Sequence, residues 1–70
     1  KEFIFSINIS SSEFLPYYQG RIQSIVVTTV TGIRVEFPAI HLRKYLTSSG
    51  ISGRFRLTTQ NNKFFSLDKL

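Results

Sequence analysis

Several short segments of this chain alternate apolar and polar residues with a period of two. The start of the chain has apolar residues at every second position, Phe3, Phe5, Ile7 and Ile9, alternating with Glu2, Ile4, Ser6 and Asn8. This is the pattern of a β-strand with one face in the core. The chain has 70 residues and no cysteine, so disulfides cannot compensate for a small core. Its seven Phe and three Tyr can each bury about 150–250 Å². We therefore predict one domain, residues 1–70, with a phenylalanine-rich core.

A short helix is predicted to follow the first strand. Ser10 and Glu13 have the spacing of a capping box, which marks a helix start. Ser12 is an alternative cap, because Pro16 would otherwise lie inside the helix and clash with a preceding carbonyl. With either cap, the helix is expected to end near Tyr18.

The middle of the chain predicts a β-hairpin. The segment from Arg21 to Val30 includes a run of almost wholly β-branched residues, which favour strands. Apolar residues at both parities indicate a strand covered on both faces. Thr31-Gly32 is a turn signal, and the alternation from Ile33 to Phe37 predicts the returning strand, which Pro38 ends.

The last part of the chain predicts a helix and a second hairpin. The segment Ala39–Leu46 has helical spacing, with four apolar residues on one side: Ala39, Leu42, Tyr45 and Leu46. The segment from Gly53 to Thr59 is expected to be a strand, and Asn61-Asn62 a tight turn. The segment from Lys63 to Leu70 is expected to form the last strand, with Phe65 and Leu67 on one face.

This order of elements is strand, helix, strand, strand, helix, strand, strand. It indicates the α+β class, with five short, mainly antiparallel strands and two short helices. An open sheet and a partly closed small barrel both fit. The alternation places five phenylalanines in the core: Phe3, Phe5, Phe37, Phe55 and Phe65.

The charge balance is basic, with nine Lys and Arg against four Asp and Glu, a net charge of +5. Such a balance favours nucleic acid, anionic lipid or an acidic protein surface, but it also serves solubility alone. No apolar run reaches the roughly 20 residues that span a bilayer, and no signal peptide is visible. We expect a cytoplasmic protein without membrane contact; because Lys1 is not preceded by Met, further residues are expected upstream.

The residues that usually carry catalysis are few and scattered. His41 is the only histidine, whereas a metal site needs three or four ligands. Glu13 is explained by capping, and Glu36 by cross-strand charge pairing near Arg34 on a solvent face. The glycines form no phosphate-binding motif. We therefore expect no enzyme activity, no catalytic residue, no metal and no cofactor.

Two surface features are candidates for contact with a partner. Adjacent aromatics on a helix diverge by about 100°, so one of the two tyrosines is expected to pack and the other to be partly exposed. Arginines at alternate positions share the outer face of a strand and, if the hairpins lie side by side, form a basic stripe. The candidate contacts are Tyr17, Tyr18, Arg34, Arg54, Arg56 and Lys63.

The sequence also resembles a known family along its whole length. The phrases that carry the resemblance are Phe14-Leu15-x-Tyr17-Tyr18-Gln19-Gly20, Ile25-Val26-Val27, Gly32 to Ala39, Leu42-Arg43 and Gly50-Ile51-x-Gly53-x-Phe55. They resemble short uncharacterised proteins, chiefly from gammaproteobacteria, described as the domain of unknown function 2835. The resemblance implies a stand-alone cytoplasmic domain and carries no activity, cofactor or site residue.

From these observations we expect a small non-enzymatic protein-interaction module. Its partner is another protein or a second copy of the chain, since a core this small gains from burying an edge strand. The alternative is a basic small barrel that binds single-stranded nucleic acid through arginines and aromatics.

Overall fold

The computed structural model describes all residues from 1 to 70 and contains five strands and two helices in the predicted order. α1 is an α-helix, η1 is a 3-10 helix, and none of the helices is long and apolar enough to cross a bilayer. The elements are β1 (Glu2–Ile9), α1 (Ser11–Tyr18), β2 (Ser24–Thr28), β3 (Arg34–Pro38), η1 (Ala39–Tyr45), β4 (Ile51–Gln60) and β5 (Lys63–Lys69).

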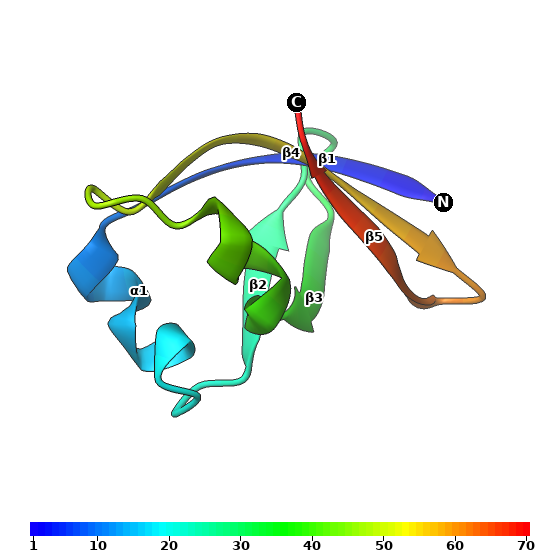
Figure 1. Ribbon diagram of the computed structural model, residues 1–70. Coiled ribbons are helices and arrows are strands. Elements are labelled where there is room, and N and C mark those ends of the chain that lie inside the picture. Colours follow the sequence, from blue (N-terminus) through cyan, green and yellow to red (C-terminus); the bar gives the residue numbers. More distant parts are fainter.

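The strands form two antiparallel sheets. One has the order β1-β4-β5 and the other is the β2-β3 hairpin. Figure 1 shows this hairpin crossing the long β1 and β4 strands, with both helices on the same side of those strands. A single bridge between Phe5 and Thr29 joins the sheets, and the Val30 amide donates to the Ile4 carbonyl at 2.8 Å. The predicted α+β class is confirmed, and the strands form open sheets and no closed barrel.

The core lies between the sheets and the helices. Phe5 is at its centre: its ring centroid is 5.7 Å from those of both Phe37 and Phe55, one on each sheet. α1 contributes the buried Phe14, and η1 contributes the buried Leu42. Burial of these large rings is the main favourable contribution in so short a chain.

α1 begins as the capping pattern predicts. The Glu13 amide donates to the Ser10 hydroxyl at 3.1 Å, and the Ser10 amide donates to Glu13 Oε1 at 2.9 Å. Ser10 is therefore the cap rather than Ser12, and Pro16 lies inside the helix. The eight-residue helix ends at Tyr18, as expected.

η1 is wound more tightly than predicted. Ala39 and Leu42 are buried and Tyr45 is half-buried, so the inward residues recur every three positions. A 3-10 helix has three residues per turn and sets such residues in one row. The expected α-helix is therefore a 3-10 helix, and Leu46 lies just beyond its end.

Two predictions about the β2-β3 hairpin are wrong. β2 begins at Ser24 rather than Arg21, and only one of its faces is covered. Ile25 and Val27 point into the core, whereas Val26 on the opposite face is 48% exposed. β-branched side chains have restricted χ1 rotamers that suit a strand even where they are exposed. An apolar residue at both parities therefore does not require a covering layer on both sides.

β4 and β5 form the last predicted hairpin, with one residue misplaced. Asn61 and Asn62 have φ of 56° and 63°, the left-handed conformation of a two-residue hairpin turn. Phe64 pairs with Thr59 and Ser66 with Thr58, which leaves Phe65 as the extra residue of a β-bulge. A bulge shifts the alternation by one residue, so Phe65 is 61% exposed instead of buried.

The ends of β1 and β4 are in unusually close contact. Gly50 has φ of 114°, and a Cβ there would lie 2.1 Å from the carbonyl oxygen of Ile9. Only glycine tolerates both the conformation and the close approach. This contact fixes the start of β4 beside the end of β1 and, through Ser10, beside the start of α1.

Candidate interaction surface

A pocket of about 320 Å³ lies between α1 and η1. Within it the Arg43 guanidinium carbon is 4.5 Å from the centroid of the Tyr18 ring, a cation–π geometry. No acidic residue lines this pocket. The lining residues are Tyr17, Tyr18, Gly20, Gln23, Pro38, Ile40 and Arg43.

The two tyrosines of α1 have different roles, as their adjacent positions predict. The Tyr17 ring is half-buried and stacks on buried Phe14, with centroids 5.6 Å apart. The Tyr18 side chain is 47% exposed. Tyr17 therefore packs against the core. Tyr18 stays at the surface, where the Arg43 guanidinium lies over its ring.

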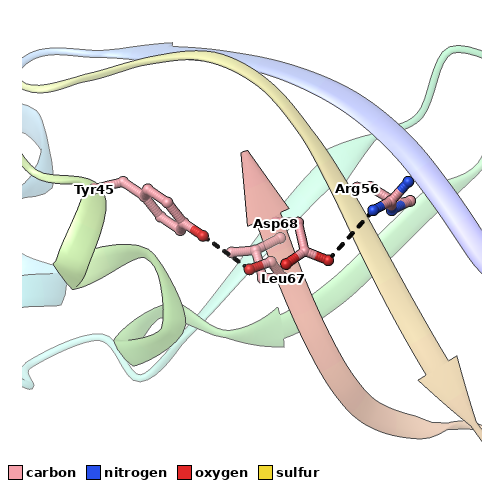
Figure 2. Close-up of polar contacts among 4 residues, drawn as sticks. All are labelled: Tyr45, Arg56, Leu67 and Asp68. Atoms are coloured by element: carbon pink, nitrogen blue, oxygen red, sulfur yellow. Dashed lines mark hydrogen bonds and ion pairs between the residues drawn. The ribbon is translucent and has the colours of Figure 1, made fainter. Parts of the chain in front are cut away.

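A second pocket, of about 340 Å³, lies between η1 and β5. Two contacts hold these elements together. The Tyr45 hydroxyl donates to the Leu67 carbonyl at 2.9 Å (Figure 2), and the His41 ring stacks on Phe64 with centroids 3.6 Å apart. The pocket is lined by Ile40, His41, Lys44, Phe64, Phe65, Ser66, Leu67 and Asp68.

Ile40 lines both pockets and is 60% exposed. It therefore connects the exposed Tyr18 of the first pocket with the exposed Phe65 of the second. We call this region the η1 surface and define it by Tyr18, Ile40, Arg43, Lys44 and Phe65. Large apolar side chains exposed in a group, rather than singly, are typical of surfaces that bind other proteins.

The charge of the η1 surface is basic. Arg43 and Lys44 are exposed, and the only acidic residue lining either pocket is Asp68. Figure 2 shows that Asp68 points to Arg56 on β4, and their charged atoms are 3.7 Å apart. This carboxylate is thus shared with a cation outside the pockets, which leaves a positive balance on the η1 surface.

His41 is the only histidine, and its surroundings favour the neutral ring. Burial lowers the pKa of His41, and the charge of nearby Lys44 lowers it further. No group of three or more His, Cys, Asp or Glu side chains is close enough to hold a metal ion.

The basic residues singled out from the sequence lie away from the η1 surface. Arg54 and Arg56 are on β4, on the face opposite the buried Phe55 and Leu57, as predicted. Lys63 pairs with Gln60 at the far end of the hairpin, roughly 20 Å along β4 from Arg54. Lys63 therefore does not join Arg54 in a stripe.

Arg34 does come into register with Arg54. Arg34 is opposite Thr28 and Ser6 is opposite Arg54, while the Phe5–Thr29 bridge sets Thr28 beside Ser6. Four residues thus lie in one row across the outer face of the sheets, with an arginine at each end: Arg34, Thr28, Ser6 and Arg54. The predicted charge pairing of Glu36 is wrong: the Ser24 hydroxyl donates to its carboxylate at 2.6 Å, and Glu36 has no ion pair.

The sequence reasoning missed most of the η1 surface. Ile40, Arg43, Lys44 and Phe65 were not candidates, although Tyr18 was. Ile40 and Arg43 are three residues apart, so a three-residue turn places them together beside the buried row of η1. That spacing is the signal in the sequence that could have indicated this surface.

Comparison with known proteins places the chain in a family. No curated protein and no solved structure matches it. The profile of one family, described as "Protein of unknown function (DUF2835)", matches residues 1–70, the whole chain. This agrees with the resemblance of the sequence phrases from Phe14 to Phe55. The chain belongs to this family of proteins of unknown function, DUF2835.

Proposed function

We propose that this domain is a non-enzymatic module that binds a peptide segment of another protein on the η1 surface. The observation that carries the proposal is the exposed apolar series Tyr18, Ile40 and Phe65, which extends across two adjoining pockets. Buried aromatic and aliphatic anchors supply most of the binding energy in protein interfaces. Two pockets joined by one exposed isoleucine suit a segment with two apolar anchors.

The charges on the η1 surface indicate the composition of the segment. Arg43 and Lys44 flank Ile40, and neither has an ion pair within the chain. A ligand with Asp or Glu beside its apolar anchors would complement them, and complementary charges speed association and select partners. The ligand class is therefore an acidic peptide with large apolar residues.

Selection from a random peptide library tests this proposal. The purified domain is expected to enrich peptides with one or two large apolar residues flanked by Asp or Glu. A synthetic peptide with the enriched consensus is then titrated by fluorescence anisotropy. The double variant Ile40→Ala/Arg43→Ala is expected to weaken binding at least tenfold, because it removes an anchor contact and the guanidinium of the first pocket.

A matched control separates the η1 surface from general surface effects. Val30 is 59% exposed, and Arg54 is exposed on β4. The double variant Val30→Ala/Arg54→Ala removes the same kinds of side chain elsewhere and is expected to leave binding unchanged. No enriched consensus, or equal loss in both variants, would contradict the proposal.

Single-stranded nucleic acid is the alternative ligand. The row ended by Arg34 and Arg54 favours it, but the exposed aromatics Tyr18 and Phe65 line the two η1 pockets instead of this row. A labelled oligonucleotide at about 50 mM salt decides, because phosphate contacts are strongest when screening is low. Binding that falls steeply with salt and is lost in Arg54→Ala/Arg56→Ala would replace the peptide proposal; we expect no binding.

A further inference from the structure

β3 is an outer strand whose free edge can be assigned residue by residue. Its only neighbour is β2, and the Thr29 amide donates to the Ile33 carbonyl at 2.7 Å. Backbone groups alternate in direction along an antiparallel strand, so those of Val35 and Phe37 also face β2. The amides and carbonyls of Arg34 and Glu36 therefore face away from the sheet, where no strand pairs with them.

The side chains beside this edge carry opposite charges. Arg34 and Glu36 are two residues apart and project from the same exposed face of β3. Neither forms an ion pair within the chain, where the only ion pair joins Arg56 and Asp68. The Ser24 hydroxyl donates a hydrogen bond to Glu36 Oε2, which leaves Oε1 free to accept from a further donor.

We propose that a second copy of this chain pairs with the β3 edge, antiparallel, around a two-fold axis at Val35. In this register Arg34 is opposite the partner's Glu36, and Glu36 is opposite the partner's Arg34. The two pairs would form four backbone hydrogen bonds, because both residues direct their amide and carbonyl to the free edge. The β2-β3 hairpins of the two copies then form one four-stranded sheet.

The neighbouring registers are disfavoured by charge and by hydrogen bonding. A shift that opposes Arg34 to its own copy sets two like charges together, which destabilises a sheet. A shift in the other direction opposes Glu36 to its own copy and aligns Arg34 with the partner's Pro38. Proline has no amide to donate. Only the register centred on Val35 pairs unlike charges and also satisfies the outward amides and carbonyls of both Arg34 and Glu36.

The same geometry limits the strength of the dimer. Pro38 ends β3 on one side, and on the other the Gly32 amide already donates to the Thr29 carbonyl at 2.9 Å. The shared ladder is therefore short, and interfaces of small area are weak. We expect a reversible dimer that sedimentation detects at high micromolar protein and that dissociates on dilution.

Cysteine cross-linking tests the register directly, since the natural chain has no cysteine. Arg34→Cys and Glu36→Cys are mixed under mild oxidation. Across the interface these two positions are directly opposite, about 5.5 Å apart between Cα atoms, within disulfide range. The mixture is expected to form the disulfide dimer at least tenfold faster than either variant alone, because like positions lie on a diagonal about 7–8 Å apart.

A matched mixture of Arg54→Cys and Glu36→Cys measures random collision, since Arg54 is an exposed arginine on another sheet. All three substituted side chains are exposed, so the variants are expected to fold. Equal cross-linking rates in all mixtures would overturn the proposed register.

Charge reversal gives a second, independent readout. Arg34→Glu and Glu36→Arg are each expected to abolish sedimentation as a dimer, and their equimolar mixture to restore it as a heterodimer. A natural chain that remains monomeric at high micromolar protein would overturn the dimer. Arg34 and Glu36 line neither of the two η1 pockets, so failure of the dimer would leave the peptide-binding proposal standing, and the reverse.

Discussion

The outer strands β3 and β5 end their sheets in different ways. On β5, the Leu70 amide donates to the Arg54 carbonyl at 2.8 Å, so the backbone groups of Leu67 face the free edge. The Tyr45 hydroxyl donates a hydrogen bond to the Leu67 carbonyl at this edge. On β3, nothing comparable covers the groups of Arg34 and Glu36.

Other features also make β5 unsuitable for pairing with a further strand. A bulge at Phe65 interrupts its ladder, and lysines lie at both ends of the strand. Bulges, lysines and covering elements are the usual means by which proteins block exposed edges. β3 has Pro38 at one end and the charged Arg34 and Glu36 along it, but its register with β2 has no bulge. Both edge strands carry a core residue, Leu67 on β5 and Phe37 on β3, but only on β5 does a side chain bond an outward backbone group.

Truncation of one inward-facing aliphatic residue on each edge strand should show the largest difference. Leu67→Ala is expected to reduce the free energy of unfolding by about 2–4 kcal/mol, because Leu67 is almost fully buried and a cavity remains. Val35→Ala removes a half-buried side chain and should cost about 1 kcal/mol. Urea unfolding at low micromolar protein measures both. Equal losses would mean that both edges support the core alike.

Removal of the Tyr45 hydroxyl tests whether its hydrogen bond to the Leu67 carbonyl stabilises β5. Tyr45→Phe keeps the edge-to-face contact with Phe55, whose ring centroid is 5.0 Å away, but removes the donor to Leu67. We expect a loss of about 1 kcal/mol and faster hydrogen exchange in β5. Tyr18→Phe is the control, because no hydrogen bond of the Tyr18 hydroxyl is seen. An unchanged denaturation midpoint in Tyr45→Phe would show that the covering contact is dispensable.

The open edge should contribute little to stability. Arg34→Ala and Glu36→Ala are each expected to change the free energy of unfolding by less than about 0.5 kcal/mol, as is usual for exposed side chains. Both should still prevent self-association. The check is urea unfolding at low protein concentration combined with sedimentation at high concentration; a large loss of stability would assign these residues to the fold instead.

Mild acidification should weaken the contact of His41 with Phe64 between η1 and β5. Burial and Lys44 lower the pKa of His41 below its ordinary value of 6.5, so the unfolded chain binds a proton more readily than the folded one. Stability is therefore present above pH 6.5 and decreases as the pH falls below it. His41→Phe retains an aromatic ring against Phe64 and should lose this dependence between pH 7.5 and about 5.5. The same slope in both proteins would assign the effect to other groups.

Much of the fold follows from local patterns in the sequence. The capping residues Ser10 and Glu13, the Asn61-Asn62 turn and the order of elements were predicted correctly. These features depend on residues close together in the chain. Phe65 was misplaced because the bulge that turns it outward depends on pairing with β4.

The candidate site was less predictable than the fold. Tyr18 stood out in the sequence, but Ile40 and Phe65 became neighbours of one pocket only when η1 packed beside β5. The basic stripe was expected from two hairpins side by side, whereas β1 separates them. Contacts between distant segments need the arrangement of the sheets, which alternation alone does not specify.

Local patterns along the chain were enough to predict the order of strands and helices and the burial of Phe5, Phe37 and Phe55, because hydrophobic periodicity and turn residues act locally. That the Tyr45 hydroxyl bonds one sheet edge, and that Arg34 and Glu36 remain on an unpaired one, follows from the packing of the sheets alone. That outcome depends on which strands pair and on the direction of each backbone amide, and both are fixed when the two sheets pack around Phe5.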